Sequence, residues 1–144
     1  VAIVEIDAIR ALADADQPVI AAGGGGIPVM EQGSHLKGAS AVIEKDRAAG
    51  LLAKELDADV LMFITGVPNV VLNYGSDHPI NIDKMTTADA ARYAEEGHFK
   101  TGSMLPKVES SIDFINAGKG RRAIITSLDG AKSALAGKGG TTIQ

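Results

Sequence analysis

The stretch Gly97-His98-Phe99-Lys100-Thr101-Gly102-Ser103-Met104-Leu105-Pro106-Lys107-Val108 is a glycine-bracketed loop that turns into a helix. Ser103 is a good N-cap residue, and Pro106 falls in the first turn, where a missing N–H costs little. Beyond the loop, apolar residues recur at helical spacing and predict one buried face: Leu105, Val108, Ile112 and Ile115.

Lys107 is the unusual residue of this helix start. A cation in the first turn faces the positive end of the helix dipole, which costs about 0.3–1 kcal/mol at an exposed site. A bound anion would remove that cost, because free N–H groups and a lysine at one helix start suit a phosphate. The alternative is a solvated lysine that tolerates the dipole. The pattern alone leaves both interpretations open.

Helices and short apolar strands alternate along the rest of the chain. We expect helices at 4–14, 44–56, from Thr86 or Thr87 to about 95, and at 129–136, besides the helix of Lys107. We expect strands at 19–22, 59–65, 70–74, 122–126 and 141–143, of which 59–65 is apolar enough to be covered on both faces and 141–143 is an edge strand. This alternation predicts an α/β fold, a three-layer αβα sandwich with a mostly parallel central sheet, as one domain over 1–144.

Composition excludes several classes of function. The chain has 144 residues, a formal net charge of -4 and 3% aromatic residues, which argues against a nucleic-acid surface. No apolar run approaches the ~20 residues that cross a bilayer, and no signal peptide is expected at the start. Cysteine is absent, which excludes disulfides and thiolate chemistry and fits a cytoplasmic location.

Gly23-Gly24-Gly25-Gly26 follows the expected strand at 19–22 directly. Ligands of parallel sheets bind where strands end, and a glycine loop brings backbone N–H groups close to an anion. The glycine spacing does not match the dinucleotide fingerprint. The Walker A pattern fails elsewhere: Gly97 and Gly102 have its spacing, but Ser103 stands where lysine is required. We therefore expect an anion loop of another kind, with a plain solvated turn as the alternative.

Two more loops carry polar residues at strand or helix ends. Lys45 and Asp46 stand at the start of the helix expected at 44–56, where they suit a phosphate site with an orienting carboxylate. The alternative is a capping Asp46 beside a surface lysine. The loop 65–69 follows the longest apolar strand and forms either a pocket wall or a plain turn.

Other chemistries have weak signals. His35, His78 and His98 lie in separate loops without metal-ligand spacing, so we expect no protein metal site. No G-x-S-x-G nucleophile elbow is present. Two candidate phosphate lysines and a glycine-rich loop favour phosphoryl transfer, which consists largely of positioning and charge neutralisation.

Three blocks of the sequence together resemble carbamate kinases of the amino acid kinase family. These are 20–29 around the glycines, 41–46 ending in Lys45 and Asp46, and 95–108 around Lys107, in the family's order and at matching separations. The resemblance implies a cytoplasmic, homodimeric enzyme of arginine metabolism. It implies phosphoryl transfer between carbamoyl phosphate and ADP, or from ATP to carbamate, with magnesium.

The resemblance also implies roles for single residues. Lys45 and Lys107 match lysines that hold the phosphates, and Asp46 matches the carboxylate that orients them. The glycines match a loop at the phosphate and carbamate site. For the nucleotide we expect contacts from Gly66, Tyr74, Gly102 and Met104.

The resemblance covers only the second, nucleotide-binding half of such an enzyme. We therefore expect the segment alone to be inactive or nearly so, with a cut sheet edge that favours association. Gly66 and Leu105 depart from the usual pattern. Two alternatives follow: another member of the superfamily, or a non-catalytic nucleotide-binding or regulatory module.

Overall fold

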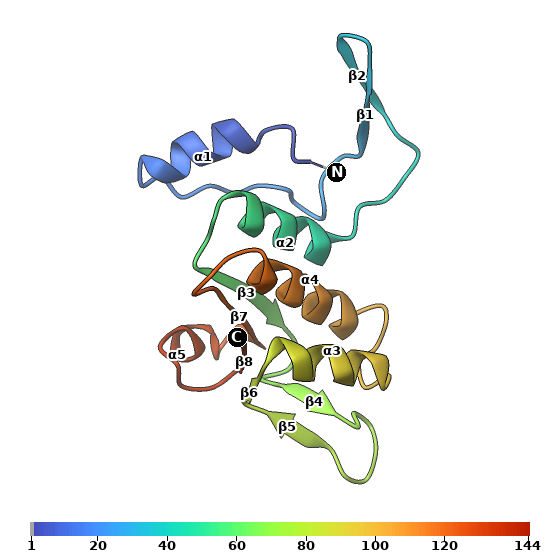
Figure 1. Ribbon diagram of the computed structural model, residues 1–144, viewed down its shortest axis with the longest axis vertical. Helices are drawn as coiled ribbons and strands as arrows, with labels where there is room; N and C mark the ends of the chain where they lie inside the picture. Colours follow the sequence, from blue (N-terminus) through green and yellow to red (C-terminus); the bar gives the residue numbers. More distant parts are fainter. Residues whose placement is uncertain (1) are drawn as a thin grey trace.

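The computed structural model describes residues 2–144, and its centre is a four-stranded sheet in the order β3-β7-β8-β6 (Figure 1). Strand β3 (Val60–Thr65) pairs in parallel with β7 (Arg122–Ser127). Strand β8 (Thr141–Ile143) runs antiparallel to β7 and parallel to β6 (Lys84–Met85). Two of the three pairings are parallel, which confirms the predicted α/β fold with a mostly parallel sheet.

Helices cover both faces of β7, as the sandwich requires. Successive strand side chains point to opposite faces. Ile125 of β7 shares a core cluster with Phe114 of α4 (Met104–Asn116). Thr126 faces α5 (Ala131–Leu135), since a Cβ atom added to Gly140 would lie 3.0 Å from both Thr126 and Ala134.

Helices α2 (Lys45–Glu55), α3 (Thr87–Glu95) and α4 agree with the sequence-based expectations to within one or two residues. Thr86 caps α3 in a reciprocal capping box with Asp89. Helix α4 packs against α2, α3 and the sheet. It therefore buries more than the single apolar stripe predicted for it: Pro106, Lys107, Val108, Ser110, Ser111 and Phe114 are buried, while Leu105, Ile112 and Ile115 are half-buried.

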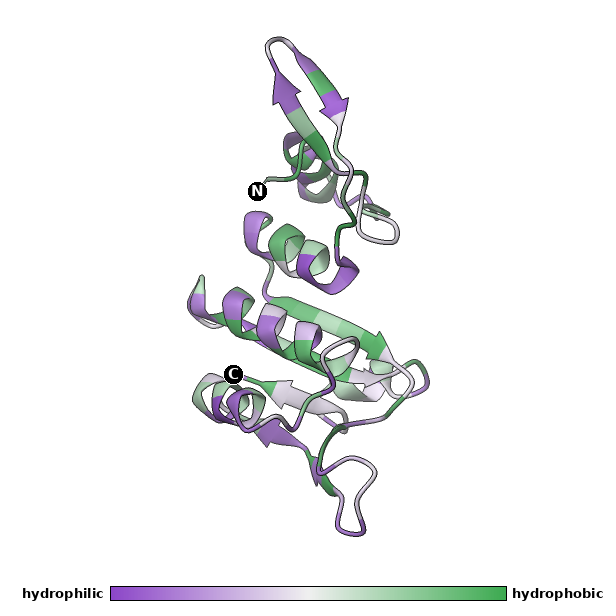
Figure 2. Ribbon diagram, turned by 90° about the vertical axis from the view of Figure 1, so that its right-hand side faces the viewer, coloured by the Kyte–Doolittle hydropathy of each residue, from purple (hydrophilic) through white to green (hydrophobic). Residues whose placement is uncertain are grey.

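Residues 2–44 are more exposed than the rest of the described chain. Helix α1 (Ile6–Asp14) joins α2 through a hydrogen bond from the Arg10 guanidinium to the Glu55 carbonyl. The hairpin of β1 (Val29–Gln32) and β2 (His35–Gly38) projects away from the sheet (Figures 1 and 2). The expected strand at 19–22 is wrong: the segment is irregular and Ile20 is 100% exposed. A strand needs a hydrogen-bonded neighbour, and among residues 2–144 none lies beside this segment.

Two other strand expectations are corrected. The segment expected at 70–74 is shorter, β4 (Val70–Leu72), and it pairs with β5 (Ile80–Ile82) outside the central sheet. Strand β8 is not an edge strand, because it lies between β7 and β6 with all three residues buried. Strands β3 and β6 occupy the two edges instead. Ile64 of β3 is 44% exposed, so β3 is not covered on both faces.

No helix within residues 2–144 has the length and apolar character to span a membrane.

Candidate functional site

Lys107 is a buried cation in an ion pair. Its Nζ atom lies 2.7 Å from Asp46 Oδ2 and donates a second hydrogen bond to the Ser103 carbonyl at 3.3 Å. The side chains of Lys107 and Asp46 are 9% and 7% exposed. The alternative of a solvated lysine is therefore wrong. The carboxylate of Asp46 compensates the charge that the helix dipole disfavours.

Lys45 approaches the same carboxylate from the solvent side. Its Nζ atom lies 3.6 Å from Asp46 Oδ2 and 3.5 Å from Glu44 Oε1, and its side chain is 58% exposed. Asp46 does not cap α2. Glu44 does, accepting hydrogen bonds from the amides of Asp46 and Arg47 at 2.8 and 2.9 Å. Asp46 is thereby free to face Lys107, and the structure brings Lys45, Asp46 and Lys107 into one cluster.

The start of α4 is capped by backbone. The Lys100 carbonyl accepts from the amides of Ser103, Met104 and Leu105 at 3.1–3.2 Å. Ser103 holds the N-cap position but makes no side-chain cap hydrogen bond. These three amides are therefore not free for a phosphate, which corrects the argument from free N–H groups. The groups left to attract an anion here are the ammonium groups of Lys45 and Lys107.

The glycine loop reaches the segment that leads into Lys45. Gly25 has φ +136°, and a Cβ atom there would lie 2.4 Å from the Ile43 carbonyl oxygen and 3.4 Å from the Lys45 amide nitrogen. Gly23 and Gly26 also have positive φ. Only glycine accepts this combination of backbone angle and close approach. The loop therefore packs against the segment that enters α2, next to Lys45 of the cluster.

A cavity of about 520 Å³ opens beside the start of α4. It is bounded by the loop after β3, by β4 and its turn, and by the loop between α3 and α4: Thr65, Val67, Asn69, Val71, Tyr74, Gly97, His98, Phe99, Lys100, Ser103 and Met104. Tyr74 and Met104, two of the four residues expected to contact a nucleotide, line it. Gly66 and Gly102 are exposed neighbours of lining residues. The loop 65–69 is thus a pocket wall.

The cavity and the lysine cluster meet at Ser103. This residue lines the cavity, and its carbonyl accepts the hydrogen bond from Lys107. Lys107 Nζ also lies 6.0 Å from the centre of the Phe63 ring, two residues before Thr65 of the cavity wall. The large cavity lies next to the two lysines of the cluster, Lys45 and Lys107. A ligand with a partly apolar body and an anionic tail fits this arrangement.

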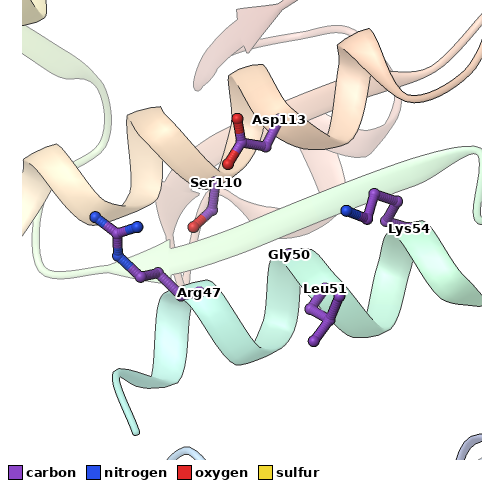
Figure 3. A pocket seen from close by; sticks show the side chains of 6 residues that line it. All are labelled: Arg47, Gly50, Leu51, Lys54, Ser110 and Asp113. Atoms are coloured by element: carbon purple, nitrogen blue, oxygen red, sulfur yellow. The ribbon is translucent and has the colours of Figure 1, made fainter. Parts of the chain in front are cut away.

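A second cavity, of about 140 Å³, lies in the seam between α2 and α4. Figure 3 shows Arg47 and Lys54 reaching toward it from α2, and Ser110 and Asp113 from α4. Its charges have both signs, and Arg47 is already paired with Glu109 at 2.7 Å. Gly50 also lines it. We explain this seam as helix packing and give it no functional role.

Sequence reasoning missed Glu44 and Asn69. Glutamate is not a preferred N-cap, so the capping rules pointed to Asp46 instead. Asn69 Nδ2 donates to the carbonyls of Ile82 and Gly140 at 3.3 and 2.9 Å, which ties the cavity wall to the sheet. The pairing of distant segments in these contacts leaves no local sequence signal. Within residues 2–144, no group of three or more histidine, cysteine, aspartate or glutamate side chains could hold a metal ion.

The sequence profile of the "Amino acid kinase family" matches residues 1–127. Over 141 residues the chain is 50% identical to the "Carbamate kinase-like protein YqeA" of Escherichia coli K12 and 46% identical to "Carbamate kinase" of Halobacterium salinarum. Each alignment covers 98% of this chain and 46% of the relative. The chain thus spans about half the length of these curated relatives.

Solved structures give the same family likeness. "Carbamate kinase from Giardia lamblia bound to AMP-PNP" superposes with a TM-score of 0.95 at 41% identity, covering 99% of this chain and 50% of that one. A "UMP kinase from Ureaplasma parvum", at 12% identity and a TM-score of 0.61, shares the fold alone.

Proposed function

The chain belongs to the amino acid kinase family, and from this premise we propose that it is the nucleotide-binding half of a carbamate kinase. The reaction moves a phosphoryl group between carbamoyl phosphate and ADP. The bond from phosphorus to the carbamate oxygen breaks, and a bond from phosphorus to the terminal oxygen of ADP forms. The relatives named carbamate kinase and their 44–47% identity to this chain support this substrate class.

The observation that carries the proposal is the cluster of Lys45, Asp46 and Lys107 beside the large cavity. Phosphoryl transfer needs fixed positive charge where negative charge spreads over the equatorial oxygens. Lys107 is fixed, because burial and Asp46 hold it. Lys45 is exposed and lies farther from Asp46 than Lys107 does, so its ammonium is free to move onto a phosphate. Asp46 orients both lysines, as a positioning residue.

The cavity accommodates the nucleoside in this proposal. Its volume of about 520 Å³ is in the range of small-molecule sites. Tyr74 and Met104 supply apolar surface for a base, with Gly66 and Gly102 in the loops beside them. The Giardia relative was solved with AMP-PNP, an analogue of ATP, which supports a nucleotide as the ligand of this fold.

The glycine loop at 23–26 completes the proposed transfer site. Its contact with Ile43 places it at the entrance to Lys45. We assign it to the phosphate and carbamate end of the substrate pair.

Magnesium is part of the proposal as a partner of the nucleotide. This ion keeps several waters and binds largely through substrate phosphates, so it needs few protein ligands. When bound, it neutralises charge on the transferring phosphates. Asp46 and Glu44 are the carboxylates beside the lysines that could orient its water shell.

The isolated chain is proposed to bind nucleotide without turning over. Half of the family's length lies outside it, and we assign the rest of the carbamate pocket, the homodimer surface and full activity to the whole protein, acting in the cytoplasm in arginine breakdown.

The test compares the chain alone with the chain joined to the first half of the Halobacterium relative. ADP binding is measured by calorimetry, and ATP formation from carbamoyl phosphate by a coupled assay. We expect binding in both and turnover only in the joined protein, lost in Lys45→Ala and retained in the matched exposed variant Lys54→Ala. Full turnover by the chain alone would contradict the proposed inactivity.

The second candidate is a non-catalytic nucleotide-binding module, favoured by the relative named only carbamate kinase-like. It predicts ADP binding by the joined protein that is lost in Lys107→Ala, with no response to carbamoyl phosphate. Turnover in the joined protein excludes it.

A further inference from the structure

One residue supplies all of the permanent charge among those that line the large cavity. Among the residues that the structure describes, Lys100 is the only Lys, Arg, Asp or Glu in its wall. The other titratable lining residues are Tyr74 and His98, and His98 faces Glu96 at 3.3 Å. No carboxylate from the described part of the chain lines the cavity, so its charge favours an anionic ligand group over a neutral one.

The backbone of Lys100 is held while its side chain is free. Its carbonyl accepts three hydrogen bonds from the start of α4. Its side chain is exposed and forms no ion pair within residues 2–144. Because this ammonium has no protein counter-ion within residues 2–144, it binds an incoming anion without first breaking an ion pair.

The net charge of the lysine cluster is too small to balance a nucleoside diphosphate. Lys45 and Lys107 share the carboxylate of Asp46, so the three side chains carry a net charge of only one. A nucleoside diphosphate carries more negative charge than that. Lys100 is a further cation in the cavity wall, three residues along the chain from the Ser103 carbonyl that Lys107 contacts.

We propose that Lys100 is a specificity-determining residue whose ammonium binds the phosphate tail of the nucleotide, so that the cavity selects nucleoside di- and triphosphates over nucleosides. This inference rests on the proposed function and names a contact outside the Lys45, Asp46 and Lys107 cluster. Nothing in the sequence pattern of the helix start points to it.

The test is calorimetric titration of the purified chain with ADP and with adenosine. The proteins are the wild type, Lys100→Ala, Lys100→Arg and the control Lys132→Ala, which removes an equal charge from α5. We expect Lys100→Ala to weaken ADP binding about 5- to 20-fold, as for a charge-assisted contact, while adenosine affinity changes less than about 2-fold. Lys100→Arg restores ADP affinity, and Lys132→Ala leaves it unchanged.

The outcomes separate this inference from the function on which it rests. Wild-type binding of ADP with no loss in Lys100→Ala overturns the role of Lys100 alone. An equal loss of ADP and adenosine overturns it too, because the residue would then shape the cavity and not read charge. A wild-type chain that binds no ADP overturns both. Thermal melts of the variants confirm that each remains folded.

Discussion

Lys107 and Asp46, 61 positions apart in the chain, form a buried ion pair whose Nζ–Oδ2 distance is 2.7 Å. The pair links the first turn of α4 to the first turn of α2. Buried pairs of this kind hold geometry more than they add stability, because desolvation offsets most of the attraction. The role of the pair is therefore to fix Lys107 beside the Asp46 carboxylate, which the exposed Lys45 also approaches.

Breaking this pair should be costly, and replacing it should not. We expect Asp46→Leu to lower the free energy of unfolding by about 3–5 kcal/mol, because it leaves the buried Lys107 ammonium without a carboxylate. Lys107→Met should cost less, because Lys45 Nζ still lies 3.6 Å from Asp46 Oδ2. The double variant should recover most of the loss. Urea unfolding of the four proteins measures the coupling. Lys45→Met serves as the exposed comparison and should cost less than about 1 kcal/mol. Additive losses in the double variant would refute the pairing.

Gly25 and Gly24 form a matched test of the glycine loop. Gly25→Ala introduces a Cβ atom 2.4 Å from the Ile43 carbonyl at a φ of +136°. Gly24→Ala meets nothing within 4 Å and has no positive φ. We expect Gly25→Ala to speed hydrogen exchange across 41–45, because the loop must move off that segment, and Gly24→Ala to leave exchange unchanged. Equal exchange in the two variants would show that the loop does not support the start of α2.

Gly50 allows α2 to approach α4. A Cβ atom there would lie 2.9 Å from Ser110 Cβ and 3.3 Å from the Ser110 carbonyl oxygen. In Gly50→Ala, overpacking should cost about 1–3 kcal/mol. The higher helix propensity of alanine offsets about 1 kcal/mol of that cost. Adding Ser110→Gly removes the nearest atom. A double-mutant cycle by chemical denaturation should therefore show favourable coupling, and its absence would contradict the close contact.

Elements set by local interactions match the sequence-based expectations better than elements set by contacts between distant segments. The capping box of Thr86 and Asp89 is local, and the helix it begins was predicted within a residue. The strand expected at 19–22 failed because a strand depends on a neighbour that local pattern cannot supply. The prediction that 141–143 is an edge strand failed for the same reason. Three residues carry no information on strand order, and β8 lies inside the sheet.

The candidate site shows the same division. Adjacent Lys45 and Asp46, and Lys107 in the first turn of its helix, were recognisable as candidate phosphate residues from their positions, and the family resemblance added their roles. The burial of Lys107, the capping by Glu44 and the use of the Lys100 carbonyl depend on contacts between segments. The catalytic roles of the lysines remain predictions.

The same capping box makes part of the stability of α3 dependent on pH. Its main hydrogen bond, from Thr86, and a second from Arg92 hold the pKa of the Asp89 carboxyl below its ordinary value of 3.8. A carboxyl whose pKa is lower when folded stabilises the protein above the unfolded pKa, and that contribution disappears as pH falls through the folded pKa. We expect Asp89→Asn to flatten the loss of unfolding free energy between about pH 5 and pH 3, the range around the ordinary Asp pKa. The exposed Asp77→Asn, in the β4–β5 turn, is the control, and an equal flattening there would contradict the assignment.

The free edge of β3 should govern self-association. The Arg122 amide donates to the Asp59 carbonyl, and a parallel ladder that begins so uses Leu61, Phe63 and Thr65 for its remaining bonds to β7. Val60, Met62 and Ile64 then direct their backbone N–H and C=O groups outward, where no other strand within residues 2–144 pairs with them. Such an edge is a template for another chain. Ile64→Pro deletes one outward N–H at a side chain already 44% exposed, so we expect less association by light scattering with the fold retained. Thr65→Pro, one residue on, deletes an inward N–H and should weaken the β3–β7 ladder and the stability instead. If both variants associate like the wild type, assembly proceeds through another surface, and the exposed apolar residues within 2–44 become the ones to vary.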